Sequence, residues 1–138
     1  MNYISKKEGY RGYIASRAIR EQIIPQHIQN LVIRDYAEKN KLHYKLSATE
    51  YSMKNCSMIF ESVLAQINSL EGIILYSMFQ LPRLKKYRLE VYKKILNSKS
   101  SLHAASEKLQ LDKEVDVERW ENIILVDYYL NNSLKEKF

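Results

Sequence analysis

The sequence has 138 residues, which is enough for one compact domain and leaves little room for a second. Hydrophobic residues make up 46% and charged residues 28%, a balance that excludes a disordered chain and indicates a folded globule. The 22 Lys and Arg outnumber the 16 Asp and Glu, so the net charge of +6 suits an anionic partner without selecting one. We therefore expect a single domain over residues 1–138.

The same arithmetic limits the compartment and the cofactors. Cys56 is the one cysteine, which excludes an intramolecular disulfide and indicates a reducing compartment. No segment approaches the roughly 20 apolar residues of a membrane span, and no signal peptide is recognisable, so we expect a cytoplasmic protein. The three His show no metal-ligand spacing, and no glycine-rich phosphate loop follows a predicted strand. We expect no metal and no cofactor.

The first half of the chain predicts two strands and two helices. Residues 11–15 predict a short buried strand, and Pro25 then opens a helix over 26–40. A second strand is expected at 43–47, a polar loop at 47–51 and a second helix at 58–69. Helical spacing predicts that the inner arc of the first helix holds Ile28, Leu31, Val32 and Tyr36.

The second half continues the alternation. Residues 72–77 form an unbroken apolar run, which is typical of a central strand covered on both faces. A weaker strand is predicted at 101–105, after a helix at 83–97, and a last helix at 117–131. The inner residues of these two helices are expected to be Leu84, Tyr87, Val91 and Ile95, then Trp120, Ile123, Ile124 and Tyr128. The basic stretch from Arg83 to Arg88 is interpreted as a solvated helix face.

Strands that alternate with helices through short links favour right-handed crossovers and a parallel sheet. We therefore expect an α/β fold with an open, three-layer sheet of about four mainly parallel strands and helices on both faces.

In such a sheet, ligands bind beyond the carboxyl ends of the strands. The residues predicted there are rich in hydroxyls and include carboxylates and a guanidinium, which suit a sugar or a phosphate ester. They are Ser16 and Arg17 after the first strand, Ser47, Thr49, Glu50 and Tyr51 after the second, Ser77, Phe79 and Gln80 after the third, and His103 or Glu107 after the fourth. Tyr13 and Tyr76 could offer further hydroxyls.

The first helix adds a polar stripe, because His27, Asn30 and Arg34 lie within roughly 60° of one another on its surface. Asp35 falls inside the apolar arc, and a buried carboxylate needs a partner. Either Asp35 locks the helix to the sheet, or it orients an arginine in the site. His27 is interpreted as a surface or capping histidine or a proton carrier, and His103 as a core histidine.

The order of elements, with Ser16 soon after Gly12-Tyr13, resembles the catalytic domain of serine recombinases, the resolvases and invertases. That family places its nucleophilic serine four residues after the tyrosine, whereas here Arg17 holds this position and Ser16 comes one residue early. The family also has an arginine pair at the start of a helix after the third strand, and Arg83 and Arg88 are spaced differently. The resemblance implies a resolvase-like or flavodoxin-like fold without strand cleavage, and we do not expect a nucleic acid partner.

Four segments resemble a small bacterial family called sporadic carbohydrate cluster proteins. These four matching segments are residues 11–14 (RGYI), 25–36 (PQHIQNLVIRDY), 46–51 (LSATEY) and 75–82 (LYSMFQLP). The resemblance implies a role in bacterial surface-polysaccharide biosynthesis, in capsule, O-antigen or lipopolysaccharide, without implying a reaction.

Together these observations predict a protein that acts on or binds a phosphorylated or nucleotide-linked sugar. Arg11, Arg17 and Arg34 are expected to hold the anion. Ser16 or Ser77 would bind or attack, and Glu50 or His27 would move a proton. One alternative is a non-catalytic scaffold that partners a glycosyltransferase or another polysaccharide-biosynthesis protein, and another is a recombinase-like domain acting on DNA. A homo-oligomer is also expected, since 138 residues bury a small core.

Overall fold

The computed structural model describes residues 7–15, 18–45, 48–50 and 58–137. Its centre is a five-stranded sheet in the order β2-β1-β3-β4-β5. The strands are β1 (Tyr10–Ala15), β2 (Ala48–Glu50), β3 (Gly72–Leu75), β4 (Ser101–Ala104) and β5 (Leu109–Leu111). The first four are parallel, and β5 pairs antiparallel with β4. The expected α/β sheet of about four mainly parallel strands is confirmed, with one short antiparallel strand added.

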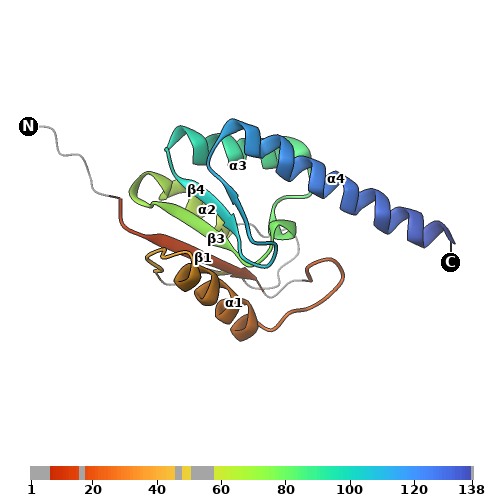
Figure 1. The fold of residues 1–138 in the computed structure, drawn as a ribbon, viewed down its shortest axis with the longest axis horizontal. Helices are drawn as coiled ribbons and strands as arrows, with labels where there is room; N and C mark the ends of the chain where they lie inside the picture. The colour runs from red at the N-terminus through yellow and green to blue at the C-terminus, as the bar shows by residue number, and fades with distance from the viewer. Residues whose placement is uncertain (1–6, 16–17, 46–47, 51–57, 138) are drawn as a thin grey trace, which may run out of the picture.

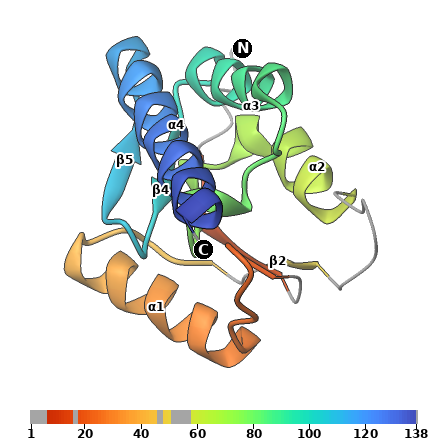
Figure 2. The ribbon, with the colours of Figure 1, turned by 90° about the vertical axis from the view of Figure 1, so that its right-hand side faces the viewer.

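Helices cover both faces of this sheet (Figure 2). They are α1 (Gln26–Lys39), α2 (Met58–Ala65), α3 (Lys85–Asn97) and α4 (Glu114–Lys137), with short 3-10 turns η1 (Ile67–Ser69) and η2 (Met78–Gln80). α1 alone packs on one face, where Ile33 meets Ile14 of β1 and Ile74 of β3. α2, α3 and α4 share the other face, whose core includes Ile73 and Trp120. The three-layer arrangement follows from this division.

The second strand lies later in the chain than the sequence predicts. Within 43–45, Tyr44 makes an isolated parallel bridge to Tyr10, and the strand forms instead at 48–50, where a loop was expected. Tyr13 of β1 pairs with Ala48, and residues 46–47 of the predicted strand lie outside the described residues. A strand of three residues is too short to show an alternating pattern, which is why the sequence misplaces it.

The helix α1 is rotated relative to its predicted apolar arc. Its buried residues are Gln29, Ile33, Tyr36 and Ala37, whereas Leu31 is 60% exposed. Asp35, predicted to be buried, is exposed and pairs with Lys39 one turn later at 2.9 Å. The rotation arises because the side chain of Gln29 bonds to the end of β1, as described below, and turns Leu31 and Asp35 outward.

α3 and α4 are joined by a buried ion pair. The Arg88 guanidinium donates to both carboxylate oxygens of Glu121 at 2.9 and 2.8 Å, and the Tyr92 hydroxyl donates to the same carboxylate at 2.7 Å. Burial opposes ionisation of Glu121, but these hydrogen bonds outweigh it and hold its pKa below the ordinary value. The interpretation of the basic stretch as a solvated face is therefore wrong at Arg88. Leu84 and Tyr87, expected to face inward, are exposed.

α4 is longer than predicted and runs past the end of the sheet (Figure 1). In its first half Trp120 is fully buried and meets the Tyr92 ring edge to face, with centroids 6.3 Å apart. In its second half Tyr128, predicted to face inward, is 62% exposed. Within the described residues, no helix has both the length and the apolar composition to cross a bilayer.

The rotation of α1 predicts unequal effects of two truncations on the same helix. Ile33→Ala should lower the free energy of unfolding by about 3 kcal/mol, because it opens a cavity against the sheet. Leu31→Ala should change it by less than about 0.5 kcal/mol, because Leu31 faces solvent. Urea unfolding followed by circular dichroism measures both changes. Equal losses of unfolding free energy in the two variants would show that Leu31 is buried and would contradict the rotation.

Candidate functional site

The candidate site is the carboxyl edge of the sheet, where the buried amide of Gln29 closes the end of β1. The last register pair between β1 and β3 is Tyr13 with Leu75, so Ala15 extends beyond β3. Gln29 Oε1 accepts from the Ala15 N–H at 3.1 Å, and its Nε2 donates to the Ala15 carbonyl at 2.6 Å and to the Ile24 carbonyl at 2.8 Å. One side chain thus satisfies backbone groups that a strand would otherwise pair.

The network continues through η2. Gln80 Nε2 donates to Gln29 Oε1 at 3.1 Å, and Gln80 Oε1 accepts from the Ser77 N–H at 3.1 Å. Ser77 Oγ donates to Glu107 at 2.8 Å and accepts from the Phe79 N–H, so the serine caps η2. Glu107, in the turn between β4 and β5, also accepts from the Met78 N–H at 2.7 Å. The edge is held by polar side chains that bind one another.

A strained turn lies at the same edge. Ile19 and Gln22 exchange two backbone hydrogen bonds, and the two residues between them, Arg20 and Glu21, have φ of 52° and 67°. This is the left-handed region, which is uncommon for residues other than glycine. The Arg20 guanidinium lies 4.7 Å from the Phe79 ring centroid and forms an ion pair with Asp127 of α4. The turn therefore connects the edge with the projecting half of α4.

The arginines expected to hold an anion do not meet. Arg11 lies near the start of β1 and donates to Gln66 at 2.7 Å, on the face covered by α2. Arg34 lies on α1, exposed, with its guanidinium 5.6 Å from the Tyr44 ring centroid. Arg17 lies outside the described residues. The predicted cluster of three arginines is wrong for Arg11 and Arg34, because the first precedes the edge and the second is on the outer side of α1.

The other predicted site residues lie in several different parts of the structure. Ser77 is 3% exposed, His27 is exposed on α1, and Asn30 accepts from the Tyr44 hydroxyl at 2.8 Å. Ser16, Arg17, Ser47, Tyr51 and Cys56 lie outside the described residues. Thr49 and Glu50 end β2, where their backbone pairs with Ile14 and Ala15 of β1. Tyr13 is fully buried in the core, and Tyr76 is half-buried against the α1 side. The structure thus brings Ser77, Phe79, Gln80 and Glu107 together.

A second buried polar group lies under α1, within β4. His103 is bound at both ring nitrogens, by the Tyr36 hydroxyl at 2.7 Å and the Ser101 hydroxyl at 2.8 Å. The Tyr10 ring meets it edge to face at 5.3 Å. Burial lowers the pKa of His103 to about 4, so the ring is neutral at physiological pH. It is a core histidine, as expected, and it lies away from the carboxyl edge.

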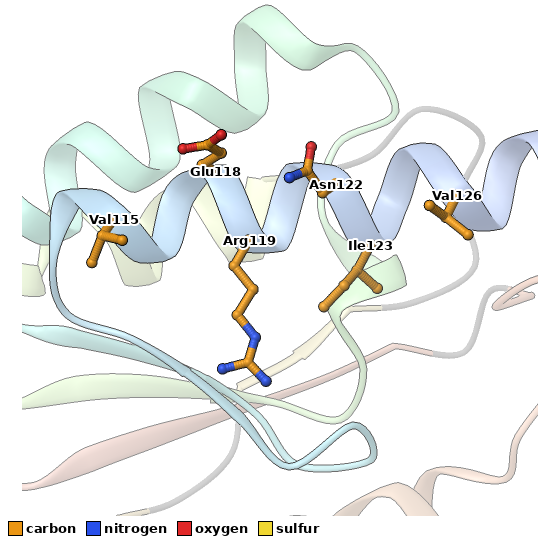
Figure 3. A pocket seen from close by; sticks show the side chains of 6 residues that line it. All are labelled: Val115, Glu118, Arg119, Asn122, Ile123 and Val126. Atoms are coloured by element: carbon orange, nitrogen blue, oxygen red, sulfur yellow. The ribbon is translucent and has the colours of Figure 1, made fainter.

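Two pockets are lined by residues of α4. The larger, about 650 Å³, is open and lined only by residues of this helix, and Figure 3 shows the Arg119 side chain reaching from the helix toward the strands. Its lining is Val115, Glu118, Arg119, Asn122, Ile123 and Val126. The smaller lies between α3 and α4. In the part of the chain that the structure describes, no three His, Cys, Asp or Glu side chains are grouped to hold a metal ion.

The chain has the fold of a resolvase family domain. The crystal structure of a resolvase family site-specific recombinase from Streptococcus pneumoniae aligns with a TM-score of 0.64 at 9% identity, covering 92% of this chain and 93% of that chain. No family model and no curated protein matches this chain. At 9% identity the likeness concerns the fold alone. The resemblance to sporadic carbohydrate cluster proteins gains no support from these matches.

The central role of Gln29 predicts a large cost for its removal. Gln29→Leu should lower the free energy of unfolding by about 3 kcal/mol, because the Ala15 and Ile24 backbone groups lose their partner. Gln66→Leu, which removes the acceptor of an exposed hydrogen bond, should cost less than about 1 kcal/mol. Urea unfolding measures both losses. Faster hydrogen exchange at the Ala15 amide should accompany the first only, and its absence would contradict the assignment.

The depressed pKa of His103 predicts a pH dependence of stability. Below pH 6.5 the unfolded chain takes up a proton on this ring, whereas the folded protein does so only near pH 4. As the pH is lowered from 6.5 to about 4, protonation of this residue in the unfolded chain should therefore lower the free energy of unfolding by up to about 1.4 kcal/mol per pH unit. His103→Gln should lack this part of the slope, and His27→Gln, at an exposed site, should retain it. Equal slopes in both variants, measured by urea unfolding, would refute the assignment.

Proposed function

We propose that this chain acts as a non-catalytic partner that docks another protein on α4. The observation that carries the proposal is the run Leu125, Val126, Tyr128, Tyr129 and Leu130, in which every side chain is between 51% and 64% exposed. These residues lie from the middle of α4 onward, and α4 runs past the end of the sheet (Figure 1). Contiguous exposed apolar surface of this kind marks an interface in soluble proteins.

The described part of the carboxyl edge favours a structural role over catalysis. Ser77 is buried and its hydroxyl is bound both to Glu107 and to the Phe79 N–H. A nucleophile needs access to its substrate as well as a nearby base. His27, the proposed proton carrier, is exposed on α1 and lies in no described hydrogen bond with this network. These observations support binding as the function, with the edge serving as the frame.

A second candidate function is the binding of a sugar phosphate or a nucleotide sugar at the carboxyl edge. The observation in its favour is that two of the four matching segments are joined there, since Gln29 of residues 25–36 bonds to Gln80 of residues 75–82. A third segment, residues 11–14, leads in β1 to Ala15, whose backbone Gln29 binds. Residues of the fourth segment form β2 beside β1.

For the first proposal, docking on α4, the resemblance of these segments to carbohydrate cluster proteins suggests which partner is docked. It would be a glycosyltransferase or another protein of polysaccharide synthesis in the cytoplasm.

The recombinase alternative is supported by the fold, since the structural neighbour is a site-specific recombinase. Against it, Arg88 is buried, its Nε and Nη2 donate to the two oxygens of Glu121, and its Nη1 donates to the Pro82 and Arg83 carbonyls, so all three nitrogens are engaged within the protein. Steep loss of duplex DNA binding with salt would favour this alternative.

The docking proposal is tested with a pair of matched variants. The partner is identified by cross-linking in the source cell, and the complex is rebuilt from the two purified proteins. Val126→Ser with Leu130→Ser should weaken it at least about tenfold, since buried apolar contacts contribute about 1.5 kcal/mol or more per side chain. Ile23→Ser with Leu31→Ser removes equally exposed side chains beside and on α1 and should leave affinity unchanged. A rebuilt complex that is insensitive to the α4 pair would refute the proposal.

A further inference from the structure

A groove lies between the start of α3 and the middle of α4, because residues of both line the same pocket. It has a volume of about 200 Å³. Its apolar wall comes from α4, with Ile124, Leu125 and Tyr128, and its cationic wall from Arg83 and Lys85 at the start of α3. Arg88, Glu121 and Asn122 complete the lining.

The charges of the groove do not cancel. Glu121, its one lining carboxylate, is bound at both oxygens by Arg88 and also by the Tyr92 hydroxyl, so this pair is internally neutral. Arg83 and Lys85 remain, both exposed, and among the described residues neither side chain forms a hydrogen bond or an ion pair; the charge of Lys85 also helps to hold the pKa of Glu121 below its ordinary value. The groove therefore presents an excess of two positive charges beside an apolar wall.

The start of α3 increases this excess. Its first turn holds Lys85 and Lys86 and no acidic residue, and the preceding Leu84 provides no side-chain cap. Cations at the positive end of a helix dipole are unfavourable, by about 0.3–1 kcal/mol each. A carboxylate brought to this end would relieve the repulsion. Leu84 and Tyr87 are also exposed there, at 57% and 46%, so apolar surface continues past the cations.

We propose that this groove binds an acidic amphipathic segment of a partner protein. Apolar side chains of the segment pack on Leu125 and Tyr128, and its carboxylates pair with Arg83 and Lys85. Complementary charge fixes the orientation and excludes basic segments, while the apolar contact provides affinity. The inference rests on the proposed function, because it specifies the chemistry of the partner that docks on α4.

The test uses two synthetic peptides and fluorescence anisotropy. One is a short labelled helix with Leu at three- and four-residue spacing and Glu on its flanks, and the other has Lys in place of every Glu. The Glu peptide should bind saturably and the Lys peptide should not. Leu125→Ser with Tyr128→Ser should weaken binding of the Glu peptide about tenfold.

The matched control separates the groove from general charge. Arg83→Glu with Lys85→Glu should weaken the Glu peptide about tenfold or more, whereas Lys93→Glu with Lys94→Glu, an equal charge change two turns further along α3, should change affinity less than about twofold. Circular dichroism melting curves establish that the variants fold. Equal binding of both peptides, equal losses in the two charge-reversed variants, or no binding of the Glu peptide would overturn the proposal.

Two other occupants are distinguished by further measurements. A dimer in light scattering that Leu125→Ser with Tyr128→Ser abolishes would identify a second copy and overturn the inference. Competition by duplex DNA stronger than that of unlabelled Glu peptide would do the same. If the rebuilt complex still depends on Val126 and Leu130 but is insensitive to Arg83→Glu with Lys85→Glu, the docking function stands and the acidic segment does not.

Discussion

The hydrogen bonds of one buried amide, that of Gln29, determine how the rest of the carboxyl edge is arranged. β1 extends beyond β3, and the Ala15 N–H and carbonyl would be buried without partners if Gln29 did not bind them. An unsatisfied buried polar group costs several kcal/mol, so this contact fixes the rotation of α1 on the sheet. Through Gln80 and Ser77 the same network reaches Glu107 beyond β4, and three loops are held in one arrangement.

Much of the fold could be predicted because β3 is an unbroken apolar run, β1 and β4 are short buried segments, and the helices show regular spacing. The rotation of α1 could not be predicted, because hydrophobic periodicity places Leu31 inside. The pattern also gives no sign that a polar residue, Gln29, is buried because its side chain bonds to the backbone. Arg88 was misinterpreted for a related reason: a run of cations indicates a solvated face, and its carboxylate partner Glu121 is on another helix. Partners distant in sequence decide both cases.

The candidate site shows the same limit. The position of Ser77, Phe79 and Gln80 after a central strand follows from the sequence, but the commitment of their side chains and backbone to a shared network depends on Glu107 and Gln29 from other segments. Arg11 and Arg34 carry the right charge and point to different surfaces. The exposed half of α4 has no sequence signature, because Tyr128 and Leu130 fit an amphipathic pattern and only the structure shows that these side chains are exposed.

The interior place of β1 in the sheet, between β2 and β3, has a consequence for synthesis of the protein. Tyr10 pairs with Gly72, so β1 cannot form its ladder with β3 until that distant segment of the chain has been synthesised and has folded back onto it. Pairings distant in sequence slow folding, since loop closure precedes any gain from contact. During this interval the nascent strand, with Tyr13 and Ile14 unburied, is an aggregation hazard of the kind that chaperones cover. Production of the protein is thus governed by kinetics as well as by the stability of the finished fold.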